Sequence, residues 1–456
     1  MVLGRLISYR VALFATVALG FNAFAQNVSA ESLSEAFISA YSSNPTLRAE
    51  RAHLRATDEL LPQALSGWRP VITETASISK TWVDNSRINK FSNTSKDLSI
   101  NLSQPIFRGF KTVEGTSAAE ARVKAGRAQL LSVEQSVLFN TVQAYFNVLR
   151  DRQILSLRQT NVSFLNKQLS ASKARFDAGE LTRTDVAQSR ASLSGAQAAV
   201  AVAVANVKAS ETGYLTVVGH LPKKLSPAHL AKAPKSLASA LAIAQEQNPA
   251  ILAAAFVEEA AVHDVGVAFG DLLPSVELGL TASRTNDPSP GVDSSSFAKV
   301  EGVVTIPLYE RGRVYSAVRQ AKHTASQNRI QVIGAVRSVR ENVTNAWNNL
   351  VAARESLVSV GAQVDASRLS LDGVRQEYLV GSRTTIDVLN AQQALLSVQV
   401  TQISAKHDQM VASYQLLASM GRLTADNLGL GNLYDPTKNY DAVRGKWFGV
   451  SADTIE

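Results

Sequence analysis

Strict alternation of hydrophobic and polar residues is the clearest local pattern in this chain. Leu98, Ile100 and Leu102 alternate with serine and asparagine, and a period of two residues predicts a strand with one apolar and one polar face. Alternation predicts strands at 97–103 and 276–283 and, more weakly, at 299–306, and a fourth strand-like stretch, 70–82, starts at Pro70, where a strand tolerates a missing N–H. Polar loops rich in Asn, Ser, Asp and Pro are expected between the strands of each pair, at 83–96 and 285–296.

Two very long stretches without proline predict long helices. Residues 110–178 and 313–380 are dominated by Ala, Leu, Val, Gln and Arg, and about 69 residues in a helix span on the order of 100 Å. A lone globular domain has no use for such a helix, whereas a coiled coil or a helical tube does. Gly179 and Gly381 mark tight reversals after the two stretches. Shorter return helices are expected at 183–218 and 384–420.

The sequence contains two copies of one domain-sized unit, at a constant offset of about 202 residues. Gly179 and Asp185 return as Gly381 and Asp387. A first helix is expected at about 32–61, with a break at an Asn-Pro pair where asparagine can cap a new helix; the second copy repeats this pair. The predicted division is a first repeat at 26–221, a linker at 222–235, a second repeat at 236–423 and a polar, partly disordered tail at 424–456.

The amino terminus has the features of a secretory signal peptide, predicted at residues 1–25. Two arginines precede an apolar run, and Ala23–Ala25 is a small-x-small cleavage site. The mature chain is expected to start at Gln26, with Ala30 as the alternative. A membrane anchor is disfavoured because the run is too short to span well. The protein is therefore expected to be exported without spanning helices.

Composition argues against several classes of function. The net charge is +8 and the chain has no cysteine, but basic residues are scattered among acids, so nucleic acid is not an expected partner. None of the six histidines forms an i, i+4 pair, so no metal site is predicted. No phosphate-binding loop or nucleophile motif is present, so we expect no catalytic residues, no cofactor and no enzyme activity.

The predicted strands suit a membrane better than a soluble sheet. Stretches of about 10–13 residues match the length of a tilted membrane-spanning strand, and aromatic residues lie near their ends, as in interfacial girdles. These aromatics are Trp82, Phe107, Phe110 and Tyr309. A soluble four-stranded sheet with one wet face is the alternative. Because four strands cannot close a membrane barrel and an open edge cannot face lipid, several chains would have to share one barrel.

The sequence resembles the TolC family of outer membrane factors over nearly all of the mature chain. The resemblance is carried by the two Asn-Pro helix breaks and by strand pairs that begin at Pro70 and Pro274. Gln104–Phe107 and its counterpart Ile306–Tyr309 also match. The most specific match is Tyr378–Leu389, around the second hairpin turn.

This resemblance implies an α+β membrane protein that forms a homotrimer. Long helical hairpins would form an α-barrel in the periplasm, and three chains of four strands would share a 12-stranded barrel in outer-membrane lipid. The resemblance also implies an exit duct of a tripartite efflux or type I secretion system for drugs or unfolded proteins. Its partners would be a periplasmic adaptor (membrane fusion) protein and an inner-membrane pump.

The resemblance further implies a gate at the periplasmic tip. In the family, a tyrosine, an arginine and acids near the helix turns close the tunnel. By position these are Tyr378 and Arg383 on the second hairpin, and Asp185 with its neighbour Thr184 on the first. A contact between Arg383 and Asp185 is expected, with the second hairpin as the moving half and the first as its fixed partner.

Other tip residues carry weaker implications. Asp387 would face the lumen as an acidic ring, whereas Asn390 stands where the family often has a second aspartate. Gly179 and Gly381 would lie at the turns where adaptors dock. The alternative is that Asp185 and Asp387 only cap the helices that follow the turns.

A competing class of function is a periplasmic coiled-coil adaptor or scaffold. Adaptors also have a signal sequence and long helical hairpins, but they carry one hairpin flanked by β-rich domains. This chain has two predicted hairpins and strands of membrane-spanning length.

Overall fold

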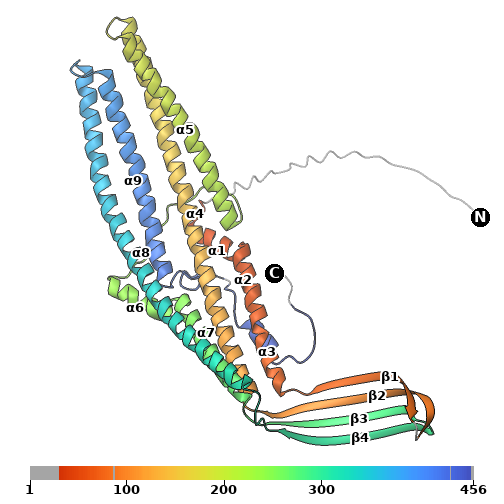
Figure 1. The fold of residues 1–456 in the computed structure, drawn as a ribbon. Helices are drawn as coiled ribbons and strands as arrows, with labels where there is room; N and C mark the ends of the chain where they lie inside the picture. The colour runs from red at the N-terminus through yellow and green to blue at the C-terminus, as the bar shows by residue number, and fades with distance from the viewer. Residues whose placement is uncertain (1–29, 86–87, 432, 453–456) are drawn as a thin grey trace, which may run out of the picture.

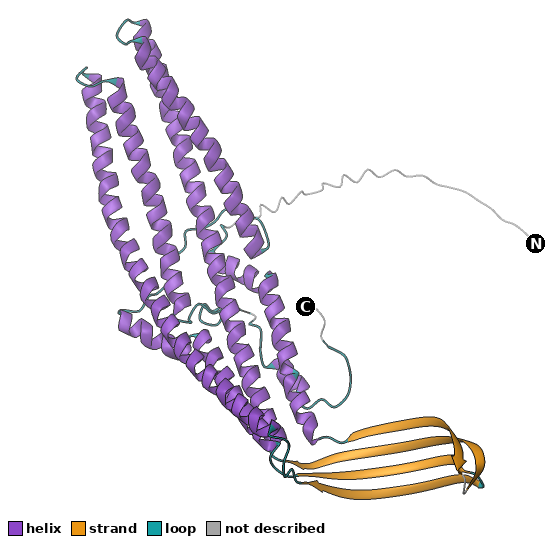
Figure 2. Cartoon of the chain, viewed as in Figure 1, coloured by secondary structure: helices purple, strands orange, loops and turns teal. Residues whose placement is uncertain are grey.

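The chain forms an α+β structure in which long helices and a sheet lie at opposite ends. The computed structural model describes residues 30–85, 88–431 and 433–452, and the predicted signal peptide lies outside this part. Two helical hairpins run in one direction, and a four-stranded antiparallel sheet projects from the other end (Figures 1 and 2).

Four long helices form the two hairpins. They are α4 (Lys111–Asp177), α5 (Arg183–Val218), α8 (Arg313–Leu379) and α9 (Thr385–Ser419). Each end lies within one residue of the boundary predicted from the sequence. Within each hairpin the return helix packs along the long one, and α9 also packs against α4, which joins the hairpins side by side (Figure 1).

Shorter helices precede the strands in both copies. In the first copy they are α1 (Leu33–Ser43), α2 (Pro45–Asp58), α3 (Leu60–Leu65) and the 3₁₀ turn η1 (Ser66–Trp68). In the second copy they are α6 (Leu237–Gln247) and α7 (Pro249–Gly270). The predicted Asn-Pro breaks therefore separate α1 from α2 and α6 from α7.

Each Asn-Pro asparagine performs the same two tasks. Asn44 Oδ1 accepts the backbone N–H of Thr46 at 3.0 Å, while its Nδ2 donates to the carbonyl of Val217 at 3.0 Å. Asn248 Nδ2 donates likewise to the carbonyl of Ser419 at 2.8 Å, and its Oδ1 caps α7. One side chain thus starts a helix and satisfies a carbonyl that the end of a return helix leaves unpaired.

The strands are longer than the sequence pattern predicts. They are β1 (Val71–Asn85), β2 (Ile88–Arg108), β3 (Ser275–Ser289) and β4 (Val292–Thr305), paired in the order β1-β2-β3-β4. The loops expected at 83–96 and 285–296 are wrong, because most of those residues continue the strands.

Polar side chains support this extension by pairing across strands. Asp97 Oδ1 accepts the hydroxyls of Ser283 and Thr285 at 3.0 and 2.6 Å. Such cross-strand hydrogen bonds stabilise a sheet whose polar face is wet. The β3–β4 connection shrinks to a tight turn in which Gly291 adopts a φ of 82°.

The two faces of the sheet differ sharply in polarity. One rung across the four strands consists of Ile72, Leu102, Leu280 and Val300, and the neighbouring rung consists of Thr73, Asn101, Thr281 and Lys299. We call the face of the first rung the apolar face. Ile72 is 65% exposed and Val300 68% exposed, so this face lacks a covering layer in the single chain. β1 and β4 also pair on one side only.

Much of the tail, at 424–431 and 433–443, packs on the helices, while disorder of about the last 15 residues stays a prediction. The backbone N–H of Ala425 donates to the buried Glu134 carboxylate of α4 at 2.6 Å. Farther on, α10 (Lys438–Val443) lies against α2, where Asn439 Nδ2 donates to the buried Asp58 carboxylate at 2.8 Å. Buried carboxylates need such donors, and the polar tail supplies them.

Because the Asn248 side chain forms two hydrogen bonds, substitutions that remove one or both of them should lower the stability to different extents. Asn248→Ser keeps a cap but loses the bond to Ser419, whereas Asn248→Ala loses both. We expect Asn248→Ala to lower the free energy of unfolding by about 1–3 kcal/mol and Asn248→Ser to fall between it and the wild type. Urea titration in detergent measures this. The exposed Asn349→Ala serves as control; equal stability of all the variants would show that the bond contributes nothing.

Candidate functional site at the two hairpin tips

Both hairpin turns use the same backbone geometry. Gly179 and Gly381 adopt φ values of 79° and 84°, in the left-handed region that suits glycine at a helix end. The backbone N–H groups of the next residues, Glu180 and Ser382, donate back across the helix end at 2.9 Å. Space is open around both glycines, so backbone conformation rather than crowding requires them.

The acids after the turns cap the return helices. The N–H of Thr182 donates to Asp185 Oδ2 at 3.0 Å, and that of Thr384 donates to Asp387 Oδ2 at 2.9 Å. The Thr182 hydroxyl lowers the pKa of Asp185, and the Thr384 N–H lowers that of Asp387. Capping is therefore the task of both acids within one chain, while Thr184 beside them is exposed.

Arg383 pairs within its own hairpin. Its Nε lies 2.8 Å from Oε2 of Glu377, and this hydrogen bond raises the pKa of Arg383. Both side chains are about half exposed, so the pair is held weakly and can exchange partners. The contact between Arg383 and Asp185 drawn from the family resemblance stays a prediction for an assembly of several chains.

Tyr378 connects the two hairpins. The guanidinium of Arg175, at the end of α4, lies 4.8 Å from the centroid of the Tyr378 ring at the end of α8. The Tyr378 hydroxyl is 3.5 Å from Oγ1 of Thr385. Arg175 also approaches Glu180 on its own turn at 3.5 Å. A cation–π contact thus links tips that belong to different copies of the repeat.

Arg175 and Glu377 were not among the predicted site residues, although the sequence carries a signal for both. At the repeat offset they occupy equivalent positions, so the two copies carry opposite charges at the same point of the hairpin. Opposite charges at equivalent positions are available for contacts between copies. The predicted site residues followed the similarity between the two copies, so this pair of opposite charges was not among them.

Asn390 lies farther from the turns, beside a groove between α5 and α9. The groove has a volume of about 330 Å³, and Arg158 and Asn161 of α4 line its floor with Asn390. Gln392 Nε2 donates to Asn161 Oδ1 at 3.0 Å and closes one side. Leu165, Leu193 and Leu389 form a small apolar cluster next to it.

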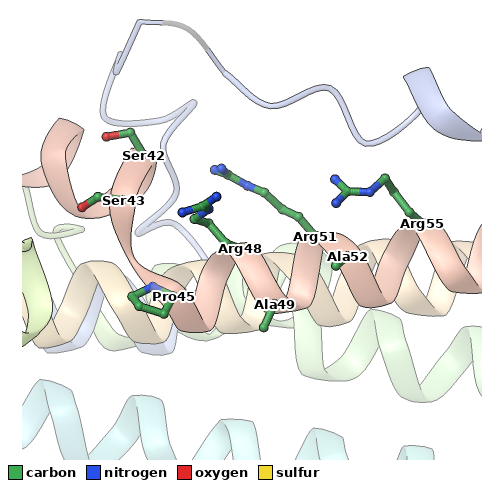
Figure 3. A pocket seen from close by; sticks show the side chains of 8 residues that line it. All are labelled: Ser42, Ser43, Pro45, Arg48, Ala49, Arg51, Ala52 and Arg55. Atoms are coloured by element: carbon green, nitrogen blue, oxygen red, sulfur yellow. The ribbon is translucent and has the colours of Figure 1, made fainter. Parts of the chain in front are cut away.

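A larger groove lies on α2, near the point where the tail contacts this helix and away from the hairpin tips. Arg48, Arg51 and Arg55 project from one side of α2 into a space of about 640 Å³ (Figure 3). The Arg51 guanidinium lies 4.5 Å from the Tyr41 ring centroid and 5.0 Å from that of Tyr434 in the tail. Arg51 therefore fastens the tail to α2.

The described residues offer contacts rather than catalytic chemistry. Within them, no three His, Asp or Glu side chains gather closely enough to hold a metal ion. In the same part of the chain, no helix combines the length and apolarity needed to cross a bilayer. The tips present ion pairs, helix caps and an aromatic contact, all of which form and break reversibly.

Comparison with known proteins shows what the chain is similar to. The profile of the outer membrane efflux protein family matches residues 38–220 and 240–422, one match per repeat. Outer membrane efflux protein BepC of Brucella suis is 42% identical over 453 residues, covering 98% of this chain and 96% of that protein. Outer membrane protein TolC of Escherichia coli is 26% identical, covering 90% and 86%. The CmeC outer membrane channel of Campylobacter jejuni shares the fold, with a TM-score of 0.77 at 18% identity over 91% of this chain and 89% of that one.

Two substitutions of Tyr378 distinguish the contribution of its ring, which contacts Arg175, from the contribution of its hydroxyl. Tyr378→Phe keeps the ring and should leave the hairpins docked, whereas Tyr378→Leu should remove about 0.5–1 kcal/mol of attraction. Because the chain lacks cysteine, spin labels on introduced cysteines at Ala178 and Ser382 report the distance between tips. We expect a broader distance distribution for Tyr378→Leu.

Arg383→Gln is the matched control, since it removes a pair confined to one hairpin. If Tyr378→Phe broadened the distribution as much as Tyr378→Leu, the hydroxyl rather than the ring would hold the tips together.

Proposed function

The chain belongs to the outer membrane efflux protein family, and from that premise we propose that three copies form one gated channel. The protein is an outer-membrane exit duct of tripartite efflux systems, with its helical tunnel in the periplasm. The family and the membrane-length sheet leave the alternative of a periplasmic adaptor or scaffold without support.

The unpaired sheet edges carry the proposal of a trimer. β1 and β4 end the sheet, and the apolar face is uncovered. An edge strand in lipid leaves backbone N–H and C=O groups without partners, at a cost of several kcal/mol each. Pairing β4 of one chain with β1 of the next removes every edge when three chains close a ring of twelve strands.

The hairpin tips are the proposed docking sites for the periplasmic adaptor that links the duct to an inner-membrane pump. Leu379 and Val380, next to Gly381, are 63% and 80% exposed. Apolar side chains so exposed at a wet tip favour a protein partner. The turn at Gly179 presents the equivalent point of the first hairpin.

The same tips supply the proposed gate. In the closed ring, Arg383 would exchange Glu377 for Asp185 of a neighbouring chain, and Asp387 would face the lumen. The contact between Tyr378 and Arg175 would hold the second hairpin against the first and break when the tunnel opens. Asn390 carries no charge, so one acidic ring fewer would line this constriction than in relatives with an aspartate there.

Each of these tip contacts is weak, as expected of a gate that a binding partner opens. An exposed ion pair contributes about 0–1 kcal/mol, so three copies hold the tunnel by a few kcal/mol at most. Binding of an adaptor supplies energy of this size. The unequal contacts of the two copies support the second hairpin as the moving half, since Arg383, Glu377 and Tyr378 all belong to it.

Single-channel recording tests both the pore and its gate. Purified protein in a planar bilayer should conduct, and Asp185→Ala combined with Arg383→Ala should raise the conductance because the ring contacts are lost. Asp185 also takes part in the capping box of α5, so the control must weaken that cap and keep the charge. Thr182→Val removes the hydroxyl bonds of the box, retains Asp185 and should leave the conductance near that of the wild type.

Equal conductance of the double variant and the wild type would contradict the gate assignment. A rise with Thr182→Val as large as that of the double variant would assign the effect to fraying of α5 instead. Absence of any conductance would contradict the channel itself.

A further inference from the structure

On three neighbouring strands, the aliphatic part of the apolar face ends at a basic residue. Along each strand toward the hairpin turns, the last aliphatic residues of this face are Ile78 on β1, Leu98 on β2 and Ala282 on β3, and on β1 the aromatic Trp82 follows beyond the basic residue. The next residues on the same face are Lys80, Lys96 and Arg284, and all three are exposed. On β4 the corresponding residue is Ser296, next to Ala298.

The strand register places these three cations along a slanted line. Ile78 of β1 pairs with Lys96 of β2, and Leu98 of β2 pairs with Arg284 of β3. The end of the aliphatic stretch therefore steps two residues toward the helices from β1 to β2 and again from β2 to β3. Strands of membrane barrels tilt by about 35–45°, so a slanted line across the strands lies at one depth in the membrane.

At the helix side of the sheet, only β1 is set back in the same sense. β1 begins at Val71, opposite Ser103, whereas β2, β3 and β4 continue to the level of Arg108, Ser275 and Thr305. The slanted line of Lys80, Lys96 and Arg284 is the pattern expected of a boundary crossed by a tilted sheet, so the three cations are treated as one row rather than three unrelated sites.

None of the three forms an ion pair with a carboxylate in the part of the chain that the structure describes. Lys80 instead lies 5.3 Å from the ring centroid of Trp82. Other lysines of the sheet are paired: Lys90 with Asp84 at 2.7 Å, and Lys299 with Glu301 on the polar face.

Within its apolar part, this face carries one acid, which lies apart from the row; beyond the row, Asp84 is already paired with Lys90. Glu74 pairs with Ile100, two residues nearer the helices than the pair of Leu98 and Arg284. The strand β2 separates Glu74 from Arg284. The row is thus a local concentration of unpaired positive charge at the edge of an apolar band.

We propose that Lys80, Lys96 and Arg284 form a binding row for the phosphate groups of lipopolysaccharide. The sheet turns point away from the helices (Figure 1), and the helices lie in the periplasm, so this row faces the outer leaflet. That leaflet presents acyl chains to the apolar band and phosphates just beyond them.

The geometry of the row fits a lipid with two phosphates. Diagonal neighbours on adjacent strands are about 7–8 Å apart, a spacing that flexible Lys and Arg side chains adjust by several ångström. Arg284 can bind a phosphate with two parallel hydrogen bonds, while the lysines act as point charges. The inference goes beyond the duct function and rests only on the apolar face meeting lipid.

Lipid binding to the purified full-length assembly tests this row. Binding of lipid A with two phosphates, of lipid A with one phosphate and of phosphatidylglycerol is measured by native mass spectrometry in detergent. The test variant carries Lys80→Gln, Lys96→Gln and Arg284→Gln. We expect it to bind the two-phosphate lipid about tenfold or more weakly than the wild type, since charge-assisted hydrogen bonds are lost.

Lys299→Gln is the matched control, because it removes one cation from the polar face of the same sheet. It should bind lipid like the wild type. If the triple variant fails to assemble, Lys96→Gln alone, at the centre of the row, should still weaken binding measurably.

Three outcomes would overturn the inference. These are unchanged binding by the triple variant, equal weakening by Lys299→Gln, and a wild type that binds phosphatidylglycerol as tightly as two-phosphate lipid A. Single-channel conductance of the same preparations separates this site from the duct. A triple variant that conducts normally and has lost the lipid supports the row, whereas loss of conductance in the wild type would count against the duct.

Discussion

An open β-sheet edge cannot lie in lipid, and the rest of this structure depends on that constraint. Water satisfies exposed backbone groups of an edge strand in a soluble protein, but the bilayer core offers no donor or acceptor. One chain provides four strands with two open edges and one uncovered apolar face. This constraint is the physical basis of the proposal that other copies supply the missing neighbours.

The duplication follows from the same constraint. A ring closed by copies of one chain needs similar units at regular intervals, and each repeat contributes one strand pair and one helical hairpin. The asparagines that start α2 and α7 repeat their hydrogen bonds almost unchanged. These helix-starting contacts are thus the same in both copies.

The tips show where the copies differ. Both keep the glycine turn and the acid cap, but Arg175 in one copy becomes Glu377 in the other. This single exchange of charge creates an ion pair with Arg383 inside the second hairpin and a cation–π contact between hairpins. In the proposed ring, this inequality between otherwise similar units would provide contacts that differ between a closed and an open state.

Local patterns predicted the long helices to within a residue, because uninterrupted helix formers end at glycines that adopt a positive φ. The strands were predicted too short, since Asp97 and its hydroxyl partners form cross-strand bonds that no local pattern reveals. The attachment of the tail was not predicted for a similar reason: its donors satisfy Glu134 and Asp58, hundreds of residues away. The contacts of Arg175 and Glu377 also depend on how distant elements pack, which local patterns do not reveal. Contacts between chains cannot be predicted from local patterns in one sequence.

The central claim is that three chains close one barrel, and native mass spectrometry of the detergent-extracted protein tests it most directly. The account predicts one dominant species with three times the mass of the mature chain, persisting on dilution because each interface joins strands in lipid. A dominant monomer or dimer, or a series of masses that continues past three chains, would contradict it.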